Sequence, residues 1–150
     1  MKKILATVGE GQFSHRQIKS LESFIRQNYR TFINAEPVLV IWNQVPSQNI
    51  FHDYHSGQPS ILVIESGKDL QQHQRVAMFE ACTRDWLRLT GQRIDQLIIS
   101  ILEGAVFKAL LQRNSQHLTK RGKIIYFFKI GTDLLVSKLL DDYYAFKSSF

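Results

Sequence analysis

The chain has 150 residues, of which 44% are hydrophobic and 21% are charged, a balance that excludes a disordered or low-complexity chain and is typical of one compact soluble domain. The net charge of +6 favours anionic partners through long-range attraction. No helix-turn-helix, zinc-finger or RNA-recognition signature organises the basic residues, so we do not expect a nucleic-acid partner.

The single cysteine and the lengths of the apolar runs indicate the cellular compartment in which the protein is expected. Cys82 has no second cysteine with which to form an intrachain disulfide, which fits a reducing environment. It lies in an apolar helical run, where a packed structural thiol is favoured over a catalytic one. No apolar run approaches the roughly 20 residues that span a bilayer, and the basic start is too short for a secretory signal. We therefore expect a cytoplasmic protein with no membrane partner.

The first part of the chain predicts a β-α-β unit. Residues 4–8 are short and apolar, which is typical of a strand. Ser14 and Gln17 have the spacing of a capping box and predict a helix start, and apolar residues at helical spacing continue to near Asn34. Residues 38–42 are again β-branched and apolar and predict a second strand.

The same pattern recurs about 57 to 59 residues later along the chain. Residues 61–64 predict a strand, and Asp69 lies where a second helix is predicted to open. Gly91 is placed just past the end of that helix, where a positive φ suits glycine. Residues 97–102 predict the fourth strand, so the chain is predicted to be a tandem β-α-β duplication.

We expect an α+β fold in which a four-stranded mixed sheet carries two helices on one face, followed by a C-terminal strand and helix. One domain is expected over residues 1–150, with pseudo-repeats at about 2–58 and 59–104 and a C-terminal extension at 105–150. Because residues 97–102 would be apolar on both faces of their strand, the second face of the sheet must also be buried. Self-association is the simplest way to bury it.

The C-terminal extension contains two predicted elements. Residues 123–130 are aromatic and β-branched and predict a strand. Asp133 is placed to cap a final helix. The apolar residues of that helix would be Leu135, Leu139, Tyr143 and Phe146. The basic residues at 120–123 favour a solvated loop, with an anion or nucleic-acid contact as the alternative.

Two further groups of polar residues have simple interpretations. His52, Asp53 and His55 are a weak metal signal, because a third histidine or other partner is missing, and a solvated loop is favoured. Arg84 and Arg88 lie four residues apart on the second predicted helix, which is typical of a solvent-exposed face. No glycine-rich phosphate loop or paired-cysteine motif is present, so we expect neither a metal nor a cofactor.

Three passages carry a resemblance to a known family. Residues 40–51 are similar to the strand and turn of the cis-3-chloroacrylic acid dehalogenase branch of the tautomerase superfamily, with proline, asparagine and phenylalanine at matching spacing. Residues 61–68 resemble the third strand and its turn, and residues 74–86 with 98–103 resemble the second helix and fourth strand. The chain therefore resembles that superfamily over about residues 36–104, nearest its dehalogenase and malonate semialdehyde decarboxylase branches.

The resemblance implies a homotrimer whose sheets pack around a central barrel and whose catalytic group is an amino-terminal proline. It also implies arginines that hold the carboxylate of a small substrate. Lys2 stands where the family has that proline, so the Met1 amine and Lys2 are the remaining candidates for proton exchange. We expect weak, altered or absent chemistry on small carboxylate or keto-acid compounds, of tautomerase or lyase type if present and not by proline catalysis.

The resemblance also points to substrate-binding positions. Lys68 takes the place of the first substrate-binding arginine and keeps its positive charge, though not its two-pronged hydrogen bonding. Tyr29, or its neighbour Asn28, falls near the histidine that the dehalogenase branch has in its first helix. Ser100 corresponds to the tyrosine of the fourth strand. The alternative function is a non-enzymatic trimeric assembly or binding module that uses its basic surface and its C-terminal tail.

Overall fold

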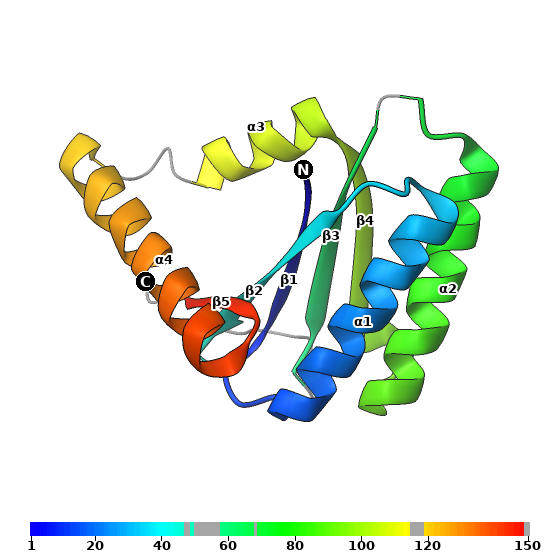
Figure 1. Cartoon of the computed structure of the whole chain (residues 1–150), viewed down its shortest axis with the longest axis horizontal. Coiled ribbons are helices and arrows are strands. Elements are labelled where there is room, and N and C mark those ends of the chain that lie inside the picture. The colour runs from blue at the N-terminus through cyan, green and yellow to red at the C-terminus, as the bar shows by residue number, and fades with distance from the viewer. Residues whose placement is uncertain (47–48, 50–57, 68, 115–118, 149–150) are drawn as a thin grey trace.

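The computed structural model describes residues 1–46, 49, 58–67, 69–114 and 119–148. In chain order, its elements are β1 (Lys2–Gly9), α1 (His15–Phe32), β2 (Val38–Val45), β3 (Ser60–Ser66), α2 (Gln72–Thr90), η2 (Ile94–Gln96), β4 (Leu97–Glu103), α3 (Gly104–Asn114), α4 (Lys120–Asp141) and β5 (Tyr144–Lys147). The strands form one sheet in the order β4-β3-β1-β2-β5. Figure 1 shows α1 and α2 side by side against this sheet, with α4 beside the edge strand β5.

The sheet contains both predicted β-α-β units. β1 and β2 run parallel on either side of α1 in the chain, and β3 and β4 run parallel on either side of α2. The two units meet where β1 pairs antiparallel with β3. The predicted α+β class and mixed sheet are therefore confirmed. The described part of the sheet has five strands instead of the four predicted for the duplication, because β5 adds to the outer edge of β2.

The predicted start of α1 and the predicted end of α2 are confirmed by their hydrogen bonds. The predicted opening of α2 at Asp69 is wrong, since this helix begins at Gln72 with Gln71 as its N-cap. The Ser14 hydroxyl accepts the Gln17 N–H at 3.3 Å, and the Gln17 side-chain oxygen accepts the Ser14 N–H at 3.0 Å, which completes the capping box of α1. Gly91 ends α2 in the left-handed region at φ 71°, and its N–H donates to the Leu87 carbonyl at 2.9 Å.

The core lies between the sheet and the two helices. Trp42 from β2 stacks on Trp86 from α2, with ring centroids 6.2 Å apart, and Phe13 meets Trp86 edge-on at 5.9 Å. Each indole is almost wholly buried, and burying a large aromatic side chain contributes about 2–3 kcal/mol or more. These rings fix α2 to the middle of the sheet.

A buried polar bridge joins α1 to α2. The Asn28 side-chain amide donates to the Asp85 carboxylate at 3.0 Å. The Arg84 and Arg88 guanidinium groups also lie within 3.5 Å of that carboxylate. Both arginine side chains are exposed, as predicted for a solvent-facing side of the helix. Cys82 is buried beside Asn28, and burial raises the pKa of its thiol to about 12. Such a thiol is protonated and packed, as predicted for a structural cysteine.

The structure corrects the prediction for the C-terminal extension. Residues 123–130 lie within the single long helix α4 and do not form a strand. Thr119 caps this helix by accepting the Gly122 N–H at 3.1 Å, so Asp133 lies inside the helix and does not begin it. Tyr143 and Phe146 lie beyond its end, and Phe146 belongs to β5. α3, which precedes α4, was not predicted.

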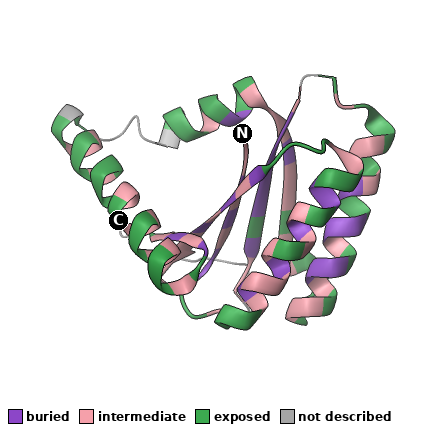
Figure 2. Ribbon diagram, in the orientation of Figure 1, coloured by how far each residue is buried: buried purple, intermediate pink, exposed green. Residues whose placement is uncertain are grey.

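The helices α1 and α2 cover only one face of the sheet. On that face Ile4, Val40 and Ile64 have no exposed surface. On the opposite face Ile61 and Ile98, which are register partners in β3 and β4, are 36% and 51% exposed. Figure 2 shows the buried colour gathered between the sheet and the α1–α2 layer, while most of α4 is exposed. Within the described ranges, each helix is too short or too polar to cross a bilayer.

A side-chain network at the base of the core generates a stability prediction. The Gln92 side-chain oxygen accepts both the Trp86 indole N–H at 2.7 Å and the Ser60 hydroxyl at 3.0 Å. Gln92→Ala leaves these two nearly buried donors without this acceptor, so we expect the free energy of unfolding to fall by about 2–4 kcal/mol. Urea denaturation monitored by tryptophan fluorescence measures the change.

The matched control is Gln27→Ala on the exposed face of α1, which should change the free energy of unfolding by less than about 0.5 kcal/mol. If the two variants were equally stable, the network around Gln92 would contribute nothing to the fold.

Candidate functional site

The first residue of β1 lies in a small charged cluster at one end of the sheet. The Lys2 ammonium nitrogen lies 3.7 Å from Glu65 Oε1 and donates to the Ser66 carbonyl at 3.4 Å. The second carboxylate oxygen, Glu65 Oε2, accepts the Lys3 backbone N–H at 3.0 Å. We call Lys2, Lys3, Glu65 and Ser66 the amino-terminal cluster.

The cluster follows from the antiparallel pairing of β1 with β3, which brings the start of one strand beside the end of the other. The Glu65 side chain is only 8% exposed, whereas that of Lys2 is 29% exposed. A carboxylate so removed from water needs both of its partners. A Cβ atom added at Gly104, the first residue of α3, would lie 3.0 Å from Glu65 Oε1, so α3 starts directly against the carboxylate.

The structure places the other predicted substrate-binding residues in different surroundings. Tyr29 is fully buried, its hydroxyl donates to the Glu65 carbonyl at 3.1 Å, and burial raises its pKa to about 12. Ser100 is the register partner of Val63, two residues along β4 from Leu102, which pairs with Glu65. The fold therefore brings Tyr29 to the backbone of the amino-terminal cluster and places Ser100 on the uncovered face of the sheet.

The remaining predicted residues divide between the surface and the part of the chain that is not described. Met1, whose amine is a predicted catalytic candidate, is 77% exposed. Lys68 lies outside the described residues, as do His52, Asp53 and His55. Among the residues that the structure describes, no three histidine, cysteine, aspartate or glutamate side chains are grouped to hold a metal ion.

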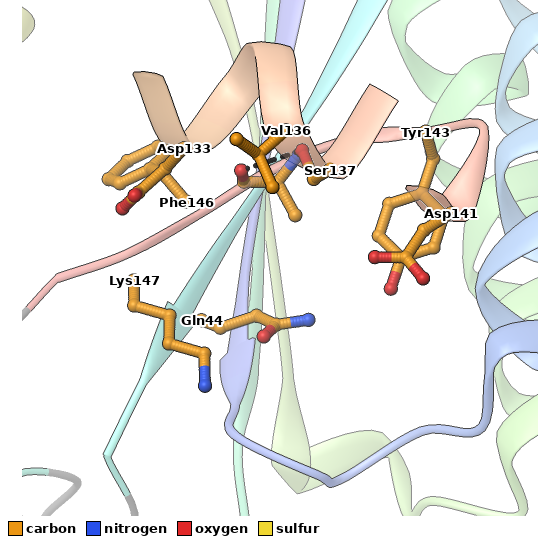
Figure 3. Close-up of a pocket in the computed structure, with 9 residues that line it drawn as sticks. Gln44, Asp133, Val136, Ser137, Asp141, Tyr143, Phe146 and Lys147 are labelled. Carbon is orange, nitrogen blue, oxygen red and sulfur yellow. Dashed lines mark hydrogen bonds between the residues drawn. The ribbon is translucent and has the colours of Figure 1, made fainter. Parts of the chain in front are cut away.

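A cavity of about 240 Å³ lies at the other end of β2, between α4 and β5 (Figure 3). In the close-up, Asp133 and Asp141 stand toward its two ends, and Gln44 and Lys147 lie across from the helix. Lys147 forms an ion pair with Glu10. The cavity is smaller than the roughly 300 Å³ at which ligand pockets usually begin. Its lining is Gln44, Asp133, Val136, Ser137, Asp141, Tyr143, Ala145, Phe146 and Lys147.

The amino-terminal cluster and the cavity between α4 and β5 lie far apart. Gln44 pairs with Val8, six residues along β1 from Lys2, which corresponds to about 20 Å at 3.3 Å per residue. The cavity therefore does not belong to the amino-terminal cluster. It could not be predicted from the sequence, because all of its lining residues except Gln44 come from the mispredicted extension.

Sequence reasoning also missed Glu65. The available signal was a lone carboxylate at the end of the apolar run 61–64, but its partner could be named only once the antiparallel register of β1 and β3 was known. Chemically, the cluster offers an ammonium donor and a carboxylate acceptor. It offers no secondary amine, because none of Lys2, Lys3, Glu65 and Ser66 is a proline.

Comparison with known proteins identifies the architecture. No family model and no curated protein matches the chain. The solved structure of native Ps01740 is similar, with a TM-score of 0.62 at 19% identity over 67% of this chain and 92% of its own.

Two further solved structures have the same likeness. FG41 malonate semialdehyde decarboxylase, inhibited by 3-bromopropiolate, has a TM-score of 0.56 at 16% identity over 67% of this chain and 82% of its own. A fused 4-OT, solved as a wild-type asymmetric trimer, has a TM-score of 0.60 at 12% identity over 67% and 85%. These proteins are members of the tautomerase superfamily, and the chain has the fold of that superfamily, as its sequence resemblance predicted.

Proposed function

We propose that the chain is a tautomerase-fold protein without a catalytic proline, whose chemistry on small carboxylate or keto-acid compounds is weak, altered or absent. The observation that carries this proposal is the identity of the first residue of β1 and the contacts of its side chain. Lys2 stands there, and its ammonium group is held by Glu65 and by the Ser66 carbonyl. An ammonium group in an ion pair has no lone pair with which to accept a proton, so Lys2 is a poor general base.

Binding of an anion is the role that these residues suit better. Lys2 supplies positive charge at the end of the sheet, and the sequence resemblance assigns the carboxylate anchor to Lys68. The exposed Met1 amine is the group that remains for proton exchange. In this proposal Tyr29 acts by holding the Glu65 backbone, and Ser100 lines the uncovered face of the sheet near the cluster.

We also propose that the chain forms a homotrimer. Two observations support this assembly. One is the similarity to fused 4-OT structures that are trimers. The other is the uncovered sheet face, where Ile61 and Ile98 expose apolar surface that a single chain leaves in water.

A second candidate function is an assembly or binding module without catalytic activity. Its support is α4, whose large apolar side chains Phe128, Leu139 and Leu140 are more than 70% exposed. Folded monomers rarely expose such a row, so the helix is suited to a macromolecular contact.

The activity prediction concerns the missing base. A positioned general acid or base typically contributes 10²–10⁴-fold to a rate, so without one we expect the ketonisation of an enolic 2-oxo acid to be accelerated by less than about tenfold over an equal concentration of a simple primary amine. Ultraviolet absorbance of the enol follows the reaction. An acceleration above about 100-fold would show that another group has replaced the proline.

The binding prediction concerns the cationic end of the sheet. We expect malonate to bind with a dissociation constant in the millimolar range, and Lys2→Ala and Lys68→Ala each to weaken binding about three- to tenfold, because each removes one partly solvated charge contact. Titration followed by amide chemical shifts measures the constants and reports whether each variant is folded.

Arg16→Ala is the matched control, since it removes one positive charge from an exposed position at the start of α1, far from Lys2. Equal affinity of all four proteins would remove both lysines from the proposed site.

The assembly prediction is a native mass at three times the 17.4 kDa subunit. Native mass spectrometry of the untagged protein measures this mass and shows in the same spectrum which residue begins the mature chain. A stable monomer would contradict the homotrimer while leaving the binding prediction intact.

A further inference from the structure

The outer surface of α4 is an apolar feature that the described fold leaves in water. Ile124, Phe128, Leu135 and Leu139 are between 65% and 84% exposed. Figure 2 shows this exposure running along nearly the whole helix. The opposite side of α4 is held to its own chain through Ser137, whose hydroxyl accepts the Ala145 N–H at 2.8 Å and donates to the Ala145 carbonyl at 2.9 Å. The helix is therefore anchored on one side and unpartnered on the other.

The four residues lie on one stripe. At 100° per residue, their spacing of four, seven and four places them within about 80° of one another, together with Gly131. A Cβ atom added at Gly131 would meet nothing within 4 Å. The stripe thus has large side chains toward both ends and a small residue at its centre, a shape into which another helix can pack closely. We call these five residues the α4 stripe.

The charges of α4 do not suit a membrane surface. A helix that lies in the plane of a membrane collects its charges in a band apart from its apolar face. Here Lys129 and Lys138 lie nine residues apart and so on opposite sides of the helix, and Arg121 falls within the angular range of the stripe. Apolar residues extend well beyond the stripe, through Ile125 and Val136, which is typical of a helix enclosed by protein.

The exposed area of the chain, counted over all 150 residues, is large enough to include an uncovered contact surface. A compact monomer of 17.4 kDa has an accessible surface of about 7,900 Å², whereas this chain exposes 9,425 Å². The excess of about 1,500 Å² is nearly twice the roughly 800 Å² that each partner contributes to a standard stable interface.

The order of the strands indicates which surface receives α4. Sheet order β4-β3-β1-β2-β5 puts α4 beside one edge, at β5, and α3 directly after the other edge, at β4. A closed head-to-tail ring of identical chains joins one surface of each copy to a different surface of the next, and the β5 and β4 edges are two such surfaces. α3 carries its own exposed apolar residues, Val106 at 53% and Leu111 at 39%.

We propose that the α4 stripe docks on the β4–α3 edge of a second copy of this chain. The proposal rests on the proposed homotrimer, to which it adds the contact that joins neighbouring subunits. It assigns a role to the C-terminal extension, beyond the two β-α-β units that form the sheet with its covering helices.

The test compares two double variants by native mass spectrometry over a dilution series. Phe128→Gln with Leu139→Gln alters the α4 stripe, and Val76→Gln with Phe79→Gln alters exposed apolar residues of α2, outside both α3 and α4. We expect the stripe variant to dissociate at a concentration at least about 100-fold higher than the wild type, because two large apolar side chains of the contact are lost. The α2 variant should dissociate as the wild type does. Circular dichroism checks that both variants are folded.

Each result supports or overturns the proposal. A stripe variant that stays trimeric to the same dilution overturns the role of α4 and leaves the homotrimer standing. A monomeric wild type overturns both proposals. A monomeric wild type that also binds vesicles of anionic phospholipid through Phe128 and Leu139 would show that the occupant is a membrane.

Cross-linking identifies the receiving surface. Leu139→Cys and Val106→Cys proteins are mixed, refolded together and treated with a short bismaleimide, and the buried Cys82 stays unmodified. We expect cross-linked dimers in the mixture that contain one chain of each variant, since such a bond can form only between copies. If Leu139→Cys chains instead cross-link to one another, the β4–α3 edge is not the surface on which the α4 stripe docks.

Discussion

The rest of the structure depends on one constraint: the sheet has apolar side chains on both faces, but helices α1 and α2 cover only one of them. α1 and α2 bury Ile4, Val40 and Ile64 completely, and the Trp42–Trp86 stack locks the helices to that face. The register that buries these residues also fixes Ile61 and Ile98 on the opposite face, because side chains alternate along a strand. A single chain therefore cannot satisfy both faces, and the incomplete face and the exposed α4 are two consequences of the same shortage of covering surface.

The elements that could be predicted are those whose signals are local. Ser14 and Gln17 specify a helix start by hydrogen bonds within one turn, and Gly91 specifies a helix end by its own φ. The run 123–130 was mispredicted because its aromatic and β-branched composition favours a strand, whereas its conformation is set from outside the run. Thr119 starts the helix before this run, and the outer edge of β2 is occupied by β5.

In the candidate site too, residues marked by a local sequence signal could be predicted, whereas residues brought in by long-range pairing could not. Lys2 could be named from the sequence, because the resemblance marks the start of the first strand as the place of chemistry. Glu65 could not, since its role depends on an antiparallel pairing between residues 62 positions apart. Tyr29 was predicted near the site from its position in the first helix, and the structure gives it a backbone partner there, but through a buried hydroxyl that faces the core.

The pairing of Lys2 with Glu65 explains why position 2 can be tied to structure instead of catalysis. Glu65 is nearly buried, and its two oxygens are satisfied by the Lys2 ammonium group and the Lys3 N–H. Removing the ammonium would leave a buried carboxylate with one partner, at a cost of about 1–3 kcal/mol, reduced by the partial exposure of Lys2. A proline at position 2 would carry that cost, because its ring supplies no side-chain donor. The residue at the start of β1 thus stabilises the junction of the two β-α-β units.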